Sequence, residues 1–187
     1  YPILLGKEKK IRAIAEENNI DIEGLPIIDP QSDETEEKRK EYGDIFFKKR
    51  QRRGINQYES FKIMRDRNHF GCMMVETGEA DGMISGLTKN YADTIRPAIQ
   101  IIGTEEGVRK IAGMYLMLTK KGPLFMADTT VNFNPTAEEL ADITLMVARE
   151  VRNFNLVPRI AMLSYSNFGS SDSAEAKLVS KATELVK

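Results

Sequence analysis

The strongest constraint on the fold lies in the first 30 residues, where two short apolar runs flank an amphipathic segment. PILLG (2–6) and LPIIDP (25–30) are apolar runs of the length of buried strands, closed by glycine and proline. Between them, KEKKIRAIAEENN carries apolar residues at helical spacing and predicts a helix over roughly residues 7 to 18. A strand, a helix and a strand at this spacing form a βαβ unit, which implies a parallel sheet with helices covering its faces.

Helix signals follow this unit. Asp33 begins a predicted helix that runs through EEKRKEYGDIFFKKRQRR to Gly54. Asn56 and Glu59 form a capping-box pattern, which opens a second helix through ESFKIMRDR. HFGCMMVETG predicts a short apolar helix, DGMIS a strand, and NYADTIRPAIQII a further helix.

The pattern changes near residue 104. VRKIAGMYLMLT and PLFMADTTV, joined by a Lys-Lys-Gly-Pro turn, predict a β-hairpin. Thr136 and Glu139 form a capping box before a helix with the buried stripe Leu140, Ile143, Val147 and Val151. RIAMLSYS predicts a strand, followed by a Gly/Ser loop and a final helix. We therefore expect an α/β protein with one α/β domain over 1–104 and a second over 105–187, each incomplete.

Composition excludes several classes of protein. With 41% hydrophobic residues, 29% charged residues and a net charge of −1, the chain is expected to be globular, without bulk affinity for nucleic acid. Its apolar runs are far shorter than the about 18 residues of a membrane span. The single Cys72 forms no intrachain disulfide and the sequence has no Cys/His metal cluster, so we expect a cytoplasmic protein without a metal site. Tyr1 and the uncapped last helix indicate an excerpt of a longer polypeptide.

Three regions carry candidate binding residues, and each has a structural alternative. Arg50 lies in KKRQRR, where cations complement a helix C-terminus or bind phosphate. Ser85 and Gly86 end a glycine-flanked segment that is either a tight turn or a place where backbone N–H groups approach an anion. Arg96, crowded by apolar neighbours, requires a carboxylate partner such as Asp93 or Asp81, or else an anion in a cleft.

The loop SYSNFGSSDS (164–173) follows a predicted strand and offers several hydroxyl groups. Ligands of open α/β sheets bind at loops beyond the strands' carboxyl ends, so a ligand-binding loop and a plain surface turn are both open. The candidates here are Ser164, Ser166, Gly169 and Ser170. A cleft between the domains, lined by this loop and the Ser85 loop, is one hypothesis. His69, the single histidine, has no evident partner and is interpreted as a helix-start or packing residue.

Several of these motifs together resemble a known family. ADGMISG…RPAIQIIGT, FMADTTVNFNPTAEELADI and PRIAMLSYSNFGSS are similar to the phosphate acetyl/butyryl transferase (phosphotransacetylase) family, along essentially the whole chain. The closer similarity is to the C-terminal phosphotransacetylase-like domain of bacterial NADP-dependent malic enzymes. The resemblance implies two domains of the isocitrate/isopropylmalate-dehydrogenase type, with coenzyme A and an acyl phosphate in the cleft. It assigns coenzyme A binding to Arg50 and Arg96, and the glycine-serine loop to Ser85 and Gly86.

The resemblance leaves two functions open. In the first, the chain is a regulatory domain that binds acetyl-CoA and controls malate decarboxylation in an N-terminal part, which would hold NADP and a divalent metal. In the second, it is a phosphate acetyltransferase that moves acetyl between coenzyme A and phosphate; the family's catalytic aspartate would lie beyond residue 187. Phe168, where transferases often have lysine, favours the first function. A malic enzyme domain in cis and a homo-oligomer are the expected protein partners, with neither nucleic acid nor membrane.

Overall fold

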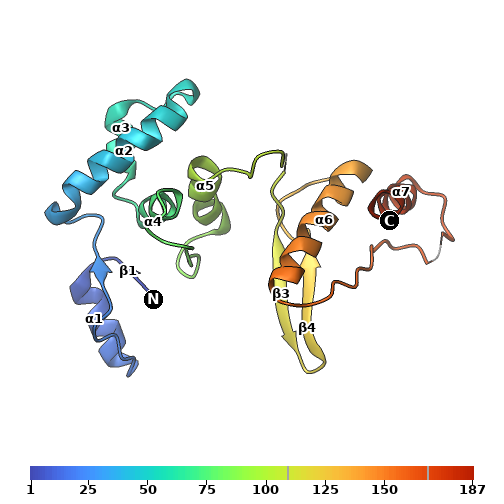
Figure 1. Ribbon diagram of the computed structural model, residues 1–187, viewed down its shortest axis with the longest axis horizontal. Helices are drawn as coiled ribbons and strands as arrows, with labels where there is room; N and C mark the ends of the chain where they lie inside the picture. The colour runs from blue at the N-terminus through green and yellow to red at the C-terminus, as the bar shows by residue number, and fades with distance from the viewer. Residues whose placement is uncertain (109, 168) are drawn as a thin grey trace. The chain divides into compact units, whose positions relative to one another are not determined.

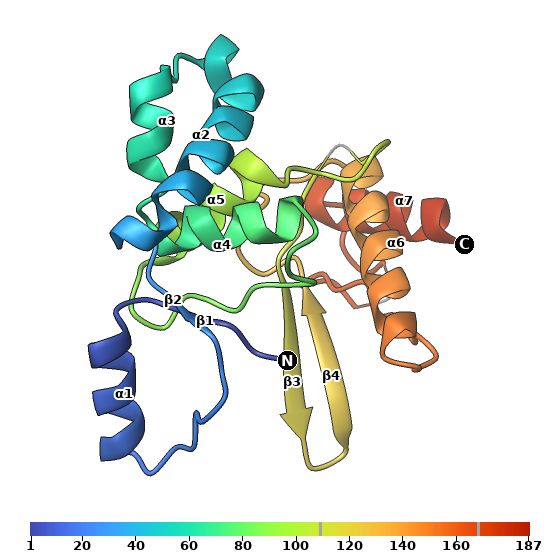
Figure 2. The same cartoon turned by 60° about the vertical axis from the view of Figure 1, so that its left-hand side comes forward.

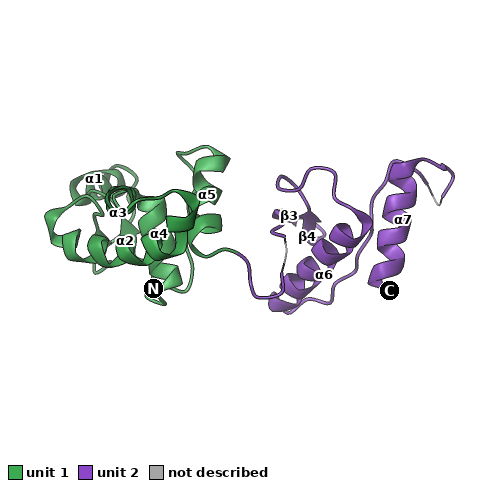
Figure 3. Cartoon of the chain, turned by 90° about the horizontal axis from the view of Figure 1, so that it is seen from above, with its two compact units in different colours: residues 1–103 green, residues 104–187 purple. Residues whose placement is uncertain are grey.

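The structure is a computed structural model that describes residues 1–108, 110–167 and 169–187. These residues form two compact units, residues 1–103 and residues 104–187, which Figure 3 shows in green and purple. Among the described residues, the first unit contains a two-stranded parallel sheet and the second a two-stranded antiparallel sheet (Figure 1). The fold is therefore a mixture of helices and small sheets of both kinds.

The βαβ unit predicted at the start of the chain is present. Its elements are β1 (Leu4–Leu5), α1 (Glu8–Glu17) and β2 (Ile27–Ile28), and both strands lie side by side in Figure 2. The strands pair in parallel with Leu4 opposite Ile27. The parallel direction follows because a helix returns the chain to the starting edge of the sheet before the second strand begins.

The other regular elements of the first unit are helices. They are η1 (Asp33–Thr35), α2 (Glu36–Arg50), η2 (Gln51–Arg53), α3 (Gln57–Ile63), α4 (Arg67–Glu76) and α5 (Tyr91–Ile101). Gly54 ends the second of the two 3-10 turns at φ +88°, a left-handed conformation that glycine adopts without strain. The predicted capping box of Asn56 and Glu59 is confirmed at the start of α3.

One apolar core holds these helices together. α2 packs on α3, and α4 packs on α5. The rings of Tyr42 on α2 and Phe70 on α4 meet edge to face, with centroids 5.0 Å apart. Burial raises the pKa of the Cys72 thiol to about 11, so it stays protonated at neutral pH. The buried cluster consists of Tyr42, Phe46, Met64, Phe70, Cys72, Met73, Met74 and Ile101.

The second unit pairs a hairpin with two helices. Its elements are β3 (Met114–Thr119), β4 (Gly122–Ala127), α6 (Ala137–Asn153) and α7 (Ala174–Val186). The predicted hairpin is confirmed, with Lys120 and Lys121 as the turn between antiparallel strands. The capping box of Thr136 and Glu139 is also confirmed, and α6 packs on α7. Within the predicted buried stripe of α6, Ile143 and Val151 are buried, whereas Leu140 and Val147 are half-buried.

The chain after β4 is organised by one carboxylate. Asp128 Oδ1 accepts from the backbone N–H of Gly113 at 2.8 Å, and Oδ2 accepts from the backbone N–H of Asn132 at 2.6 Å. The Asn132 side chain donates in turn to the carbonyl oxygen of Ile111 at 2.8 Å. Burial alone would raise the pKa of Asp128, but these hydrogen bonds outweigh burial and hold it below its usual value.

Two predicted strands are wrong. Within the described residues, neither DGMIS (81–85) nor RIAMLSYS (159–166) joins a sheet. An apolar run becomes a strand only where a neighbouring strand supplies N–H and C=O partners, and this requirement is invisible in the run itself. Met83 instead lies against α4, where its sulfur would be 2.7 Å from a Cβ placed on Gly71.

Candidate functional site

The site begins at the first turn of α4, which Asp66 caps. Asp66 Oδ1 accepts from the backbone N–H groups of Asn68 at 3.0 Å and His69 at 3.2 Å. These N–H groups have no acceptor inside the helix, so an aspartate directly before the first turn stabilises it. The cap fixes the position of the Asp66 side chain relative to the residues that follow it.

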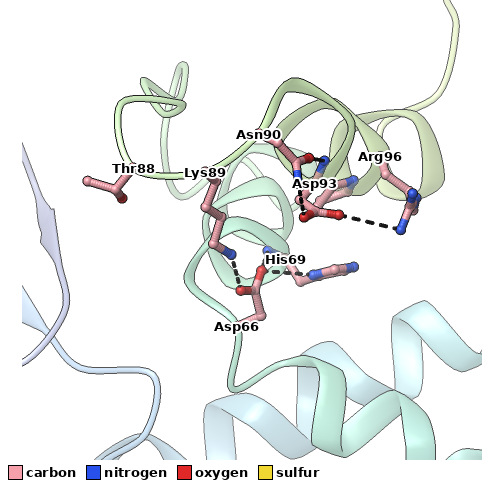
Figure 4. Close-up of a pocket in the computed structure, with 8 residues that line it drawn as sticks. Asp66, His69, Thr88, Lys89, Asn90, Asp93 and Arg96 are labelled. Carbon is pink, nitrogen blue, oxygen red and sulfur yellow. Dashed lines mark hydrogen bonds and ion pairs between the residues drawn. The ribbon is translucent and has the colours of Figure 1, made fainter.

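The same carboxylate binds two further side chains, as Figure 4 shows. His69 Nδ1 lies 3.0 Å from Asp66 Oδ1, and the Lys89 ammonium forms an ion pair with Asp66 Oδ2. Burial by itself would raise the pKa of Asp66, but the hydrogen bonds from His69 and Lys89 prevail and hold it well below its usual range. We call Asp66, His69 and Lys89 the Asp66 cluster.

The start of α5 forms the neighbouring wall. Asn90 caps this helix by accepting from the Asp93 N–H at 2.9 Å, and its side-chain amide donates to Asp93 Oδ2 at 2.7 Å. Arg96 Nη1 lies 3.7 Å from Asp93 Oδ1, and the Arg96 side chain is 61% exposed. Of the alternatives left open by the sequence, the structure provides Asp93 as partner. The expected crowding of Arg96 by apolar residues is wrong, because most of its side chain is exposed to solvent.

Pro97 creates the contact that links the start of α4 to the start of α5. Proline has no N–H, so the carbonyl oxygen of Asp93, four residues earlier, lacks its helical donor. The buried Asn68 side chain on α4 supplies one, with Nδ2 at 3.3 Å. Asn68 Oδ1 accepts in turn from the Ser85 hydroxyl at 2.8 Å. One asparagine therefore links α4, α5 and the loop that carries Ser85.

These groups surround a pocket of about 410 Å³. Two of its cationic groups, the Lys89 ammonium and the Arg96 guanidinium, are matched by the carboxylates of Asp66 and Asp93. Its lining consists of Asp66, His69, Thr88, Lys89, Asn90, Asp93, Arg96 and Pro97. A pocket with this mixture of donors and acceptors suits a polar ligand, and the exposed Arg96 guanidinium can bind a negatively charged group of it.

Ser85 and Gly86 line a second, larger pocket of about 750 Å³ in the same unit, which shares Thr88 and Lys89 with the first. Gly86 has φ +123°, a backbone conformation that other residues rarely adopt. The Ser85 hydroxyl donates to Asn68 as described, so it acts here as a structural donor. The structure thus places Ser85 and Gly86 beside the pocket that contains Arg96.

Arg50 is the last residue of α2, and it lines neither pocket. Its Nε is buried and has no hydrogen-bond partner within residues 1–108, 110–167 and 169–187. The neighbouring Lys49 is engaged structurally, since its ammonium pairs with Glu76 and donates to the Ile101 carbonyl oxygen at 2.8 Å. The basic segment therefore ends α2 as the helix-dipole interpretation requires, and phosphate binding by Arg50 stays a prediction.

The predicted serine residues of the second unit bond mainly to one another. The Ser164 hydroxyl accepts from the Ser166 N–H at 3.2 Å, and the Ser166 and Ser170 hydroxyl oxygens are 3.4 Å apart. Gly169 has φ +76°. Ser173 then caps α7. Phe168, on which the comparison with transferases depends, lies outside the described residues, and a shared cleft with the Ser85 loop stays a prediction.

Sequence reasoning missed most of the Asp66 cluster. Asp66 and Lys89 were not among the predicted site residues, nor was Asn68 beside them. The expectation that His69 has no partner is wrong. One signal was available: an aspartate three residues before a histidine, at the start of an apolar helix, is a capping pattern. Lys89, 23 residues beyond Asp66, gave no such signal.

In the part of the chain that the structure describes, no set of three or more His, Cys, Asp or Glu side chains is arranged to hold a metal ion. Each of its helices is too short or too polar to traverse a lipid bilayer.

Comparisons with known proteins agree along the whole chain. The family model for phosphate acetyl/butaryl transferase matches residues 1–187. Phosphate acetyltransferase of Bacillus subtilis strain 168 is 37% identical over 186 residues, which cover 100% of this chain and 56% of that protein. NADP-dependent malic enzyme of Escherichia coli K12 is 36% identical over 187 residues, covering 100% of this chain and 25% of that protein.

A solved structure supports the same family. The EutD phosphotransacetylase from Staphylococcus aureus matches with a TM-score of 0.83 and 32% sequence identity, over 99% of this chain and 55% of that one. The chain therefore spans little more than half the length of the phosphate acetyltransferase of Bacillus subtilis, and a quarter of the malic enzyme.

Proposed function

The chain belongs to the phosphate acetyl/butaryl transferase family, and on that premise we propose that it forms part of an enzyme that transfers an acetyl group between coenzyme A and phosphate. Support comes from the match over residues 1–187 and from relatives named phosphate acetyltransferase at 37% and 38% identity. The sequence alone favoured the regulatory function; the comparisons support the transferase better. We propose in addition that the protein has a fold of the isocitrate/isopropylmalate-dehydrogenase type, that it forms a homo-oligomer, and that it is cytoplasmic.

The observation that carries this proposal is the exposed guanidinium of Arg96 in the pocket of about 410 Å³. Its contact with Asp93, at 3.7 Å, leaves most of the five guanidinium N–H donors free. Arginine binds phosphate groups through paired hydrogen bonds, so Arg96 suits a phosphate of coenzyme A. We propose supporting roles in ligand binding for Arg50, Ser85 and Gly86, and for Ser164, Ser166, Gly169 and Ser170 of the second unit.

The proposed reaction moves one acyl group. The coenzyme A sulfur, as thiolate, attacks the carbonyl carbon of acetyl phosphate, so that a carbon–sulfur bond forms. The tetrahedral intermediate then collapses, the carbon–oxygen bond to phosphate breaks, and the electron pair leaves with the phosphate. Cationic side chains stabilise the charge on the departing group. We assign no base for the thiol within this chain; its residues are proposed to bind and orient the ligands.

A second candidate function rests on the similarity to the malic enzyme of Escherichia coli, which extends over 100% of this chain. Here the chain is a regulatory domain of a malic enzyme, and acetyl-CoA bound at Arg96 inhibits the decarboxylation of malate to pyruvate elsewhere in the polypeptide. NADP and the divalent metal would then be held by that other part. The two candidates share the ligand and differ in whether acetyl phosphate is formed.

One pair of assays on the full-length polypeptide separates them. Acetyl phosphate formation from acetyl-CoA and inorganic phosphate tests the transferase, and malate decarboxylation with and without acetyl-CoA tests the regulatory domain. For the transferase, Arg96→Ala is expected to raise the KM for acetyl-CoA by about ten- to a hundredfold, because a charge-assisted hydrogen bond contributes about 1.5–3 kcal/mol. Arg12→Ala is the matched control, since Arg12 is similarly exposed (57%) and paired with Glu8.

Three results decide between the functions. Acetyl phosphate formation that responds to Arg96→Ala but not to Arg12→Ala supports the transferase. Absence of acetyl phosphate, with malate turnover that acetyl-CoA inhibits, overturns the transferase and supports the regulatory domain. Absence of both activities overturns both proposals.

A further inference from the structure

The Asp66 cluster carries an arrangement that coenzyme A binding by Arg96 does not explain. The Asp66 carboxylate accepts from His69 and Lys89, which come from α4 and from the loop before α5. The side chains of Lys89 and His69 are 30% and 18% exposed, and both line the pocket that contains Arg96. The cluster is thus partly shielded from water, yet open to a ligand in the pocket.

Asp66 fixes which imidazole nitrogen carries the proton. Its pKa is held well below the usual range, so the carboxylate is ionised at neutral pH and can only accept hydrogen bonds. His69 Nδ1, 3.0 Å away, must therefore be the donor. In the neutral imidazole the other nitrogen, Nε2, then has a free electron pair.

The imidazole is also fixed in position. Its ring meets the ring of Phe46 on α2 nearly edge to face, with centroids 6.0 Å apart and an interplanar angle of 78°. Figure 4 shows the ring extending from Asp66 toward the side of the pocket where Arg96 lies. Within the described part of the chain, Nε2 has no hydrogen-bond partner.

The charges that face His69 are nearly balanced. Asp66 and Asp93 contribute negative charge, and Lys89 and Arg96 contribute positive charge. On α2, Arg50 lies one turn beyond Phe46 and on the same face, because positions i and i+4 of a helix share a face. Lys49, the residue before it, is neutralised by Glu76. A doubly negative ligand would shift this balance and favour protonation of the imidazole.

We propose that the Asp66 cluster binds the dianion of a phosphate group and that His69 Nε2 takes up a proton when it does so. Lys89 donates to a phosphate oxygen through ammonium hydrogens that Asp66 does not use, since an ammonium has three. The imidazolium Nε2–H donates to a second oxygen. The proton comes from solvent on binding and returns to it on release, while Asp66 keeps Lys89 and His69 in position.

Phosphate monoesters and inorganic phosphate share this chemistry, because both become dianions when their second proton dissociates, near neutral pH. The inference rests on the proposed function only for the source of the phosphate: the 3′-phosphate of coenzyme A, or the inorganic phosphate of the reaction. A ligand without a terminal phosphate should bind without proton uptake. Coenzyme A and inorganic phosphate, measured as separate ligands, distinguish the two sources.

Titration calorimetry on the full chain tests the proposal. Heats of binding are measured at about pH 8, where the free phosphate is already mostly the dianion. Measured in two buffers of different ionisation enthalpy, they give the number of protons that the protein takes up. The ligands are coenzyme A, 3′-dephospho-coenzyme A and inorganic phosphate. We expect uptake of up to about one proton with coenzyme A or inorganic phosphate, and none with the dephosphorylated form.

Three variants identify the residues. His69→Asn keeps a donor toward Asp66 but cannot take up a proton, so the uptake should disappear. Lys89→Met should weaken binding of the phosphate-bearing ligand about tenfold and leave 3′-dephospho-coenzyme A unaffected. Lys38→Met is the matched control, because Lys38 is 35% exposed, pairs with Glu79 and lies outside the pocket; it should change neither ligand. Thermal unfolding of each variant confirms that it is folded.

The outcomes are separable from those of the proposed function. His69-dependent proton uptake with either phosphate source supports the inference, even if no acetyl phosphate is formed. Equal uptake in wild type and His69→Asn, absence of uptake, or equal effects of Lys89→Met and Lys38→Met overturns it. Acetyl phosphate formation without His69-dependent uptake would leave the transferase standing and remove this inference alone.

Discussion

The two units bury their apolar residues very differently. In the first, large side chains such as Tyr42, Phe46 and Met73 are completely buried. In the second, the buried residues are mostly small, among them Ala137, Ala141, Ala148 and Ala182. The hairpin of the second unit leaves apolar side chains on both faces in contact with solvent, and Leu118 is 86% exposed.

We infer from this difference that tertiary packing stabilises the first unit and that local interactions stabilise the second. Burying a large apolar side chain contributes about 1.5–3 kcal/mol, so the first unit obtains most of its stability from its core. The second unit depends more on its hairpin turn, its helix caps and the Asp128 hydrogen bonds. Four pairs of substitutions, one member in each unit, test this interpretation. Hydrogen exchange resolved by residue reports the stability of each unit separately.

The largest difference is expected from phenylalanine truncation. Phe70→Ala removes a ring that is 2% exposed and in contact with Tyr42, so it should lower the free energy of unfolding of the first unit by about 3–5 kcal/mol. Phe125→Ala removes a half-buried ring that meets Phe154 at 5.4 Å, so the loss should be clearly smaller. Equal losses in hydrogen-exchange protection would contradict the comparison.

Glycine substitution gives the next effect. A Cβ on Gly43 would lie 2.3 Å from Phe61 Cδ1 and 3.2 Å from the Phe61 backbone, so Gly43→Ala must force α2 and α3 apart. We expect a loss of about 2 kcal/mol in spite of the better helix propensity of alanine. Gly113→Ala meets the hydroxyl groups of Thr129 and Thr130 at 2.9 and 3.0 Å, which can rotate away. Denaturant midpoints should fall for Gly43→Ala and change little for Gly113→Ala.

Acid should destabilise both units through one aspartate each. The folded pKa values of Asp66 and Asp128 lie below the unfolded value of about 3.9. Their contribution is therefore complete above about pH 4 and is lost as the pH falls through the folded pKa. Asp66→Asn and Asp128→Asn should each cost about 1–2 kcal/mol at neutral pH and should flatten the acid limb of the stability curve of their own unit. Urea unfolding from neutral to acid pH checks this; an unchanged acid limb would show that the hydrogen bonds are not formed.

The smallest effect should be the same in both units. Asn56→Ala and Thr136→Ala each remove the side chain of a capping box, which costs about 1 kcal/mol. Because a cap satisfies N–H groups of its own helix, its contribution does not depend on how well the unit's core is packed. Helix-specific exchange rates measure both losses. A much larger effect in either unit would mean that the cap also supports tertiary contacts.

Much of the fold could be predicted because it depends on neighbouring residues. The two capping boxes, the Lys120–Lys121 turn and the parallel β1–β2 pair follow from patterns within about 30 residues of sequence. The strands expected at DGMIS and RIAMLSYS could not be predicted reliably, because a strand is defined by its partner. An apolar run contains no information about whether a partner is present.

The candidate site was predicted only in part. The sequence pointed to Arg96 and offered Asp93 as its partner, and both line the pocket. It did not predict that Lys89 reaches Asp66, because the two are 23 residues apart and belong to different elements. Nor did it predict that Asn68 supplies the donor that Pro97 removes from α5. These contacts depend on how the two helices lie against each other.

The sequence by itself determined the family, the helix starts and the presence of an arginine followed by proline in a helix. Each of these follows from neighbouring residues or from several motifs in a fixed order. Only the tertiary structure decided that Arg96 faces a pocket, and that Asp66 holds His69 and Lys89 beside it. The physical reason is that hydrogen bonds and ion pairs act over about 3 Å, a separation that packing sets and that sequence spacing does not contain.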